Sequence, residues 1–234
     1  MALVRGPEIV RNGLALYLDA ANRKSYVSGS SSWKDLSGNN KGGSLVGTMT
    51  FVGGSPAYFN TNATLITEQN YLSCVSTVFA DASNYTFELW VKSRSSPSAT
   101  YNSLLGRGAT WPWLTLLHND TTGQNWYIAF RETGGTYNNF TSITNYNISN
   151  NWTSIVITSD ASRNVSFYLN GVFKETKIVT NNTFTVSRIA GGYASGANYY
   201  SLQGLISICR IYNKTLSADE ILTNYNANKT RFGI

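Results

Sequence analysis

Short apolar segments separated by turn residues constrain this fold more than any other feature of the sequence. The segments are rich in β-branched and aromatic residues, and Gly, Asn, Asp or Ser bounds most of them. They run from Gly13–Ala20 near the start of the chain to Gly204–Tyr212 near its end. Many short strands at this spacing are typical of a β-sandwich or a β-barrel. Hairpin turns are expected at Ala161–Asn164 and at Asn170–Gly171, where the Asn-Gly pair predicts a tight turn.

The length of the chain, 234 residues, suits one large all-β domain or two small ones. No linker, low-complexity segment or internal repeat divides it. We therefore expect a single domain over residues 12–231, with an N-terminal arm at 1–11 and a short tail at 232–234. A domain of this size buries roughly 70% or more of the surface of its unfolded chain, so it needs neither a metal nor a disulfide to be stable.

One helix is expected close to the C-terminus, in the segment "LSADEILTNYNA". Ser217 is its predicted N-cap, and Glu220 three residues later completes a capping box. Ile221, Leu222 and Tyr225 form an apolar stripe at helical spacing. Because the helix closely follows the last strand, we expect it to pack against an end or an edge of the sandwich.

The charge pattern argues against a nucleic-acid partner. The net charge is +6, but Lys and Arg are spread singly and no window holds three together. This pattern indicates a mildly basic surface with a weak attraction to acidic partners, such as a bacterial envelope or an acidic protein shell. The N-terminus lacks the pattern of a signal peptide, and no apolar run approaches transmembrane length, so we expect a cytoplasmic origin and no membrane partner.

The two cysteines give little indication of a disulfide. Cys209 alternates in phase with Leu205 and Ile211, which favours a buried free thiol. A disulfide with Cys74 is the alternative, but no spacing pattern of cysteines supports it.

The stretch "SWKDLSGNNKGGSLVG", Ser32–Gly47, places one acid among Gly, Asn and Ser. As a calcium loop of the EF-hand type counted from Asp35, it has Asn40 where Gly is needed and Val46 where Glu is needed. As a phosphate loop it fails because a strand follows it rather than a helix. We expect no metal site here.

A structural role is the favoured interpretation of this stretch, with a ligand site as the alternative. Asp35, Ser37, Gly38 and Asn39 have the composition of an Asx or Ser-type turn. Trp33 would then plug the sandwich beside the turn.

Five segments stand in an order that resembles a known family. They are Gly13–Tyr26, Trp33–Gly47, Tyr85–Ser93, Asn150–Val172 and Leu202–Ala227. Together they resemble the laminin-G-like, concanavalin A-like jelly-roll domains, and more closely those of tailed-bacteriophage structural proteins. The resemblance covers about residues 12–231.

The resemblance implies an all-β jelly-roll sandwich of two antiparallel sheets packed face to face. It further implies a Trp at the start of a central strand, here Trp152, and a G-x-I-x-x-x-R-I-Y strand, here Gly204–Tyr212. Many relatives carry an Asp-rich turn where this chain has Asn60 and Asn62, so a calcium site of the family type is not expected.

Glucanases share this fold, so catalysis has to be considered. They need two carboxylates that face one cleft. The strand around Glu88 and the strand around Glu132 each carry one acid only, and His118 lacks a nucleophile motif. We expect Glu88 to be a strand-surface residue and the protein to be neither an enzyme nor dependent on a cofactor.

Two aromatic clusters are the candidate binding residues. Their members, with the polar residues near them in the sequence, are Trp111, Trp113, Asn119, Asp120, Tyr193, Tyr199 and Tyr200. Aromatic faces with a few amide or carboxylate groups can hold a sugar. Tyr and Trp are also enriched at protein interfaces, so a subunit contact or core packing is the alternative, and the interface is preferred.

Two functional hypotheses follow. The preferred one is a non-enzymatic virion surface protein of a tailed bacteriophage, either capsid decoration or a fibre module, made in the host cytoplasm. Its expected partners are the major capsid protein or fibre subunits, further copies of itself and a host-surface glycan. The second hypothesis is a lectin-like module that attaches to host surface polysaccharide, and a glycoside hydrolase is a remote third.

Overall fold

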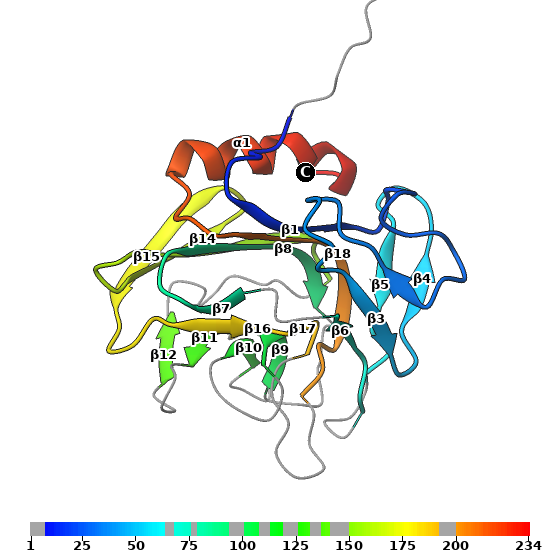
Figure 1. Ribbon diagram of the computed structural model, residues 1–234, viewed down its shortest axis with the longest axis horizontal. Helices are drawn as coiled ribbons and strands as arrows, with labels where there is room; N and C mark the ends of the chain where they lie inside the picture. Colours follow the sequence, from blue (N-terminus) through cyan, green and yellow to red (C-terminus); the bar gives the residue numbers. More distant parts are fainter. Residues whose placement is uncertain are drawn as a thin grey trace, which may run out of the picture.

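The computed structural model describes residues 8–63, 68–75, 79–93, 101–107, 113–118, 126–131, 137–140, 150–191 and 200–234. Within these residues the chain forms two large antiparallel sheets packed face to face, with a helix on top (Figure 1). The predicted all-β jelly-roll sandwich with one short C-terminal helix is therefore confirmed.

The first sheet has eight strands among the described residues. Its order is β15 (Val172–Ile178), β14 (Asn164–Leu169), β13 (Thr153–Ser159), β8 (Tyr85–Ser93), β18 (Gly204–Tyr212), β5 (Tyr58–Asn60) and β4 (Thr50–Val52). β1 (Leu14–Asp19) pairs with the C-terminal half of β18.

The second sheet also has eight strands within the described parts of the chain. Its order is β12 (Tyr137–Phe140), β11 (Trp126–Arg131), β10 (Trp113–His118), β9 (Tyr101–Gly106), β17 (Arg188–Ile189), β6 (Tyr71–Cys74), β3 (Gly43–Val46) and β2 (Ser32–Trp33). β7 (Phe79–Ala82) and β16 (Phe184–Val186) form a separate antiparallel pair.

Alternation along the strands builds the core between the sheets. On β8, Phe87 and Leu89 face the other sheet and are fully buried there, whereas Glu88 and Trp90 face outward. Successive side chains of a strand point to opposite faces, so one strand supplies both layers of packing.

A bulge in β18 changes which residue of this strand faces the core, so the predicted phase of Leu205 with Cys209 is wrong. The register against β8 shifts between Ile206 and Ile208. Ile206 therefore joins Cys209 and Ile211 in the core, and Leu205 is only half-buried.

Both cysteines are free, and Cys209 is fully buried, as predicted. Burial raises the pKa of the Cys209 thiol well above its usual value, which keeps the thiol neutral. Burial likewise raises the pKa of half-buried Cys74 to about 12.

The helix lies across the outer face of the first sheet, not at an end or edge as the sequence suggested (Figure 1). α1 (Ala218–Asn228) continues into the short 3-10 helix η2 (Lys229–Phe232). Ile221 packs with Val156 and Tyr212 of the sheet, whereas Leu222 is 44% exposed and takes no part in the predicted stripe. The position follows from the outward apolar residues of the first sheet, which need a cover.

The capping box of α1 is confirmed. The backbone N–H of Glu220 donates to Ser217 Oγ at 3.2 Å, and the N–H of Ser217 donates to Glu220 Oε2 at 2.9 Å. The Asn-Gly turn is also confirmed, with Asn170 at φ 50° and Gly171 at φ 76° between β14 and β15.

At the edge of the first sheet, β15 carries an ion pair. Glu175 and Lys177 lie 2.9 Å apart and stand opposite Phe167 and Val165 in the ladder. Directly opposed residues share a face, so the two charges lie on the core side of the edge strand.

None of the helices in the described part of the chain is long and apolar enough to span a membrane.

Candidate functional site

The Asp35 turn is fully occupied by the protein itself. Oδ1 accepts hydrogen bonds from the backbone N–H groups of Tyr17 (2.9 Å) and Ser37 (2.8 Å). Oδ2 accepts from Ser37 Oγ (2.7 Å) and from the N–H of Lys41 (3.0 Å). The N–H of Asn39 donates to Ser37 Oγ at 3.2 Å. The predicted Asx and Ser-type turn is thus confirmed, and four donors use the acceptor sites of the carboxylate.

The predicted plug beside this turn is confirmed as well. Trp33 is fully buried in the core, with its ring centroid 4.6 Å from that of Phe59. A hollow of about 300 Å³ beside the turn has Lys24 and Lys34 in its lining, which makes it unfavourable for a cation. No group of three or more His, Cys, Asp or Glu that could hold a metal occurs in the part of the chain that the structure describes.

Glu88 is not the strand-surface residue that the sequence suggested. Although it faces outward, α1 covers it, and its exposed fraction is 1%. Arg210 Nη1 donates to Glu88 Oε1 at 2.6 Å, and Asn224 Nδ2 donates to Glu88 Oε2 at 2.8 Å. Arg210 Nη2 also donates to Asn228 Oδ1 at 3.2 Å. This buried pair attaches α1 to the sheet and is out of reach of a ligand.

The Glu88 carboxylate favours the charged form of Arg210. Burial by itself lowers the pKa of the Arg210 guanidinium, but the Glu88 carboxylate beside it outweighs burial and leaves that pKa raised. The guanidinium of Arg210 is therefore charged in the folded protein, and its contact with Glu88 is buried, where a charge–charge contact is stronger than at the surface.

Most of the predicted aromatic candidates lie outside the described residues, namely Trp111, Asn119, Asp120, Tyr193 and Tyr199.

Two members of the predicted set can be placed. Trp113 begins β10 opposite Gly106 of β9, and Tyr200, half-buried at φ 47°, accepts a hydrogen bond on its carbonyl from the N–H of Ser103 of β9 at 3.0 Å. At Trp113 and at Tyr200, one residue from each cluster, the backbone therefore lies against β9.

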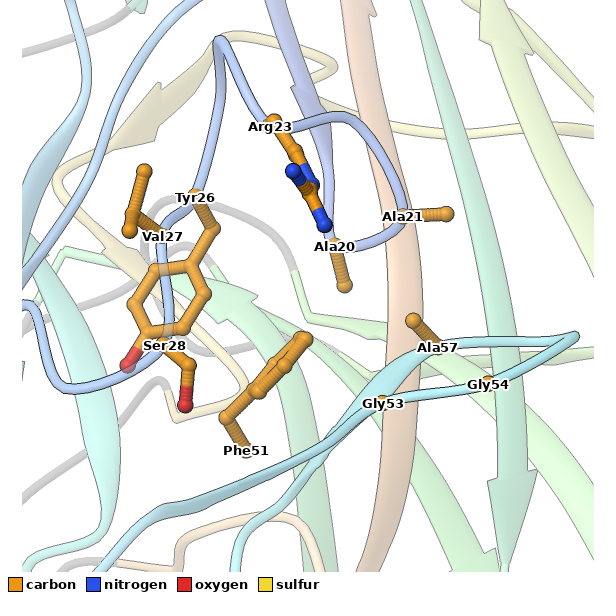
Figure 2. A pocket seen from close by; sticks show the side chains of 10 residues that line it. All are labelled: Ala20, Ala21, Arg23, Tyr26, Val27, Ser28, Phe51, Gly53, Gly54 and Ala57. Carbon is orange, nitrogen blue, oxygen red and sulfur yellow. The ribbon is translucent and has the colours of Figure 1, made fainter.

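A pocket of about 710 Å³ lies elsewhere, between the loop after β1 and the β4–β5 hairpin (Figure 2). Its lining residues are Ala20, Ala21, Arg23, Tyr26, Val27, Ser28, Phe51, Gly53, Gly54 and Ala57. This pocket was not predicted from the sequence, because its aromatic residues fit a core pattern. The Gly53-Gly54 pair, which opens the hairpin turn, was the only local signal.

The floor of the pocket is aromatic, and its rings pack against the core. Tyr26 and Phe51 lie with ring centroids 4.8 Å apart at an interplanar angle of 43°. Tyr26 is buried against Phe59 at 4.7 Å, and its hydroxyl donates to the carbonyl of Ser30 at 2.9 Å. Phe51 is half-buried, so part of its ring faces the pocket.

The rim is polar and basic. Arg23 is exposed, and Figure 2 shows its side chain directed from the loop into the pocket, toward Ala20. Among the described residues that line the pocket there is no Asp or Glu. Gly54 has φ 122°, and a Cβ at this position would meet no atom within 4 Å, so the hairpin side is an open wall of backbone.

The nearest acid in the sequence, Asp19, is engaged on another side. Arg231 Nη1 lies 3.0 Å from both of its carboxylate oxygens. The N–H of Ala21 donates to Oδ1 at 2.9 Å, and the Tyr17 hydroxyl donates to Oδ2 at 3.1 Å. The pocket therefore combines an aromatic floor with one guanidinium that no neighbouring carboxylate neutralises.

Comparison with family models agrees with this architecture. The model described as concanavalin A-like lectin/glucanases superfamily, of the laminin G type, matches residues 66–222, which is more than half of the chain. The chain belongs to this family. All lining residues of the pocket precede the matched range, so the pocket is not part of what defines the family match.

Solved structures share the fold over nearly the whole chain. Domain 4 of AbnA, an extracellular GH43 arabinanase from Geobacillus stearothermophilus solved with arabinotriose, has a TM-score of 0.62 at 17% identity, covering 91% of this chain and 98% of that one. The binding domain of Paraclostridial Mosquitocidal Protein 1 has a TM-score of 0.61 at 19% identity, covering 93% of this chain and 52% of that one.

The botulinum neurotoxin serotype D binding domain has a TM-score of 0.61 at 13% identity, covering 92% of this chain and 52% of that one. This chain thus spans about half of the two toxin binding domains. Among curated proteins, no match is found. At these identities the likeness shows the fold and carries no ligand over to this chain.

Proposed function

We propose that this protein is a non-enzymatic carbohydrate-binding module and that the pocket above Phe51 holds the sugar. The observation that carries the proposal is the pocket itself, an aromatic floor with a polar rim in a domain of a lectin and glucanase family. Sugars bind through the apolar C–H face of the ring on an aromatic side chain, with a few polar groups at the edge. The volume of about 710 Å³ suits a ligand of one to a few sugar rings.

The engagement of the acids supports a binding role without catalysis. Glycoside hydrolysis needs two carboxylates that flank the scissile bond. In the described chain Glu88 is buried under α1, Asp35 is saturated by its own turn, and Asp19 is paired with Arg231. None of them lines the pocket. A sugar held there would be bound without being cleaved.

We place this module on the surface of a tailed-bacteriophage particle, where it would serve capsid decoration or form part of a fibre. The order of the five sequence segments supports this location. Its partners would be the major capsid protein or fibre subunits and further copies of itself, and the sugar would belong to the host surface. Labelling with a specific antibody on purified particles in the electron microscope tests the location, and particles that carry no label would contradict it.

Sugar binding is tested with a glycan array on the wild-type chain and on Phe51→Ala. We expect a set of hits in the wild type and loss of about tenfold or more in affinity in the variant, because a buried aromatic anchor contributes about 1–3 kcal/mol. Phe173→Ala is the matched control, since Phe173 is a 52% exposed phenylalanine on a different edge strand. Absence of any hit, or equal binding by Phe51→Ala in folded protein, would overturn the proposal.

A further inference from the structure

We infer that the pocket selects sugars that carry a negative charge and that Arg23 is the residue that recognises the charge. This inference rests on the sugar-binding role proposed above and adds to it the chemical class of the sugar. The shared chemistry is an anionic group on a sugar ring, either the carboxylate of an acidic sugar or a sulfate ester.

The first argument is that Arg23 is available. In the described chain its guanidinium has neither an ion pair nor a hydrogen bond, although its side chain is directed into the pocket (Figure 2). Two other arginines behave differently, since buried Arg210 pairs with Glu88 and half-buried Arg231 pairs with Asp19. An arginine that reaches over a hollow without a protein partner can present its full set of donors to a ligand.

The second argument is that no described residue of the lining opposes an anion. The lining that the structure describes contains no carboxylate, and the Asp19 carboxylate is held by Arg231, Ala21 and Tyr17. The net charge of +6 adds a general attraction for anions. An anionic ligand therefore gains a partner without facing repulsion from the lining.

The third argument is geometric. A guanidinium binds a carboxylate or a sulfate through two parallel hydrogen bonds, which fixes the orientation of the ligand as well as its charge. The aromatic floor lies across the pocket from Arg23, with the exposed part of Phe51 beneath (Figure 2). A sugar ring that rests on Phe51 would direct a charged substituent toward the rim and leave its hydroxyls to the hairpin backbone of Gly53 and Gly54.

The experiment measures binding of single sugars by calorimetry and by saturation-transfer NMR. The probes are glucuronic acid, N-acetylneuraminic acid and glucose 6-sulfate, with glucose and N-acetylglucosamine as neutral counterparts. The variants are Arg23→Gln, which removes the charge, and Arg23→Lys, which keeps the charge without the fork. Arg11→Gln is the matched control, because Arg11 is an exposed arginine outside the pocket. Inorganic sulfate is included as an anion without a sugar.

We expect the wild type to bind the acidic sugars about tenfold or more tightly than the neutral ones, in line with a charge-assisted pair. Arg23→Gln should remove this difference, because the charge-assisted pair is lost. Arg23→Lys should keep part of the difference, and Arg11→Gln should keep all of it. Carboxylated and sulfated probes that differ from each other identify which anionic group the pocket prefers.

Several results would overturn the inference. Equal binding of acidic and neutral sugars, with Arg23→Gln unaffected, would refute the charge selection and leave the carbohydrate-binding proposal in place. An equal loss of acidic-sugar affinity in Arg11→Gln would assign the effect to net charge. Full competition by inorganic sulfate would show an anion site that does not recognise the sugar ring. If no sugar binds at all, the proposed function fails first and the charge selection fails with it.

Discussion

Two regions of this molecule, the sheet under α1 and the pocket beside the β4–β5 hairpin, use arginine in opposite ways. Under α1, Arg210 is fully buried, and its guanidinium is held by Glu88, by Asn228 and by the ring of Tyr17 at 4.7 Å. At the pocket, Arg23 is exposed and has no protein partner in the described chain. The difference shows that Arg210 contributes to the fold through its protein partners, whereas Arg23, above an apolar floor, has the donors free that we propose for a ligand.

The largest expected effect comes from removing one partner of the buried Glu88–Arg210 pair. Glu88→Ala leaves the Arg210 charge buried without its partner, which should lower the free energy of unfolding by about 3–5 kcal/mol. Chemical denaturation monitored by tryptophan fluorescence measures it. The double variant Glu88→Leu with Arg210→Met should recover much of the loss, because no charge is then buried. A single variant that costs less than about 1 kcal/mol would contradict the assigned role.

A second fully paired acid, Asp35, should show a smaller loss. Asp35→Ala removes the acceptor of four hydrogen bonds and should cost about 2–3 kcal/mol, because backbone donors of Tyr17 and Lys41 lose their partner. Urea denaturation gives the value. Thermal melts of the wild type in calcium and in chelator should overlap, and a fall of several degrees in chelator would show a metal that stabilises the fold.

The helix α1, which covers the Glu88–Arg210 pair, can be destabilised at its first turn. Ser217→Ala removes the N-cap of α1 and should cost about 1 kcal/mol. Hydrogen exchange at the amides of α1 should accelerate in the variant, whereas exchange at the pocket loop should not. An unchanged denaturation midpoint in a folded variant would argue against this cap.

Low pH should also destabilise α1, the helix that covers the Glu88–Arg210 pair. Burial alone would raise the pKa of the Glu220 carboxyl, but hydrogen bonds from Lys214 and Ser217 outweigh it and lower that pKa below its usual value. A carboxyl with a lowered folded-state pKa stabilises the fold above its unfolded value of about 4.3, and this stabilisation is lost as pH falls through the folded value. Melting temperature should therefore fall less steeply below about pH 5 in Glu220→Gln than in the wild type. Identical pH profiles would contradict the contribution.

The smallest expected effect on stability concerns Arg23 at the pocket. Arg23→Gln should change the free energy of unfolding by less than about 0.5 kcal/mol, because an exposed residue without a partner leaves no cavity and no unpaired charge. Denaturation in parallel with Arg210→Gln makes the comparison direct. A large loss in Arg23→Gln would show that this guanidinium also serves the fold.

Local patterns explain which parts of the structure were predictable. The capping box around Ser217, the Asn170-Gly171 turn and the Asp35 turn each depend on residues close together in the sequence, and all three are confirmed. The position of α1 was not predictable from the sequence. Polar residues such as Glu88 alternate with apolar ones along β8, as in a strand with one face in solvent, and no residue near Glu88 in the sequence indicates that Arg210 pairs with it.

The candidate site was harder to predict than the fold. Tyr26 and Phe51 are far apart in the sequence and read as ordinary core aromatics, and only the fold brings them together below Arg23. Most residues of the aromatic clusters that the sequence favoured, Trp111 and Tyr199 among them, lie outside the described residues, so the role of these clusters stays a prediction. Aromatic count alone cannot separate a binding floor from a core, because both need the same residues.

The ion pair on β15 bears on how densely such a domain can be displayed. Copies fixed side by side on a shared surface meet at effective concentrations on the order of millimolar, where exposed sheet edges tend to join. Extending the first sheet at β15 would place Glu175 and Lys177 against a neighbouring strand on the core side of the edge. Inward charges at an edge oppose such joining, so crowding at this edge should favour contacts through side chains over fusion of sheets.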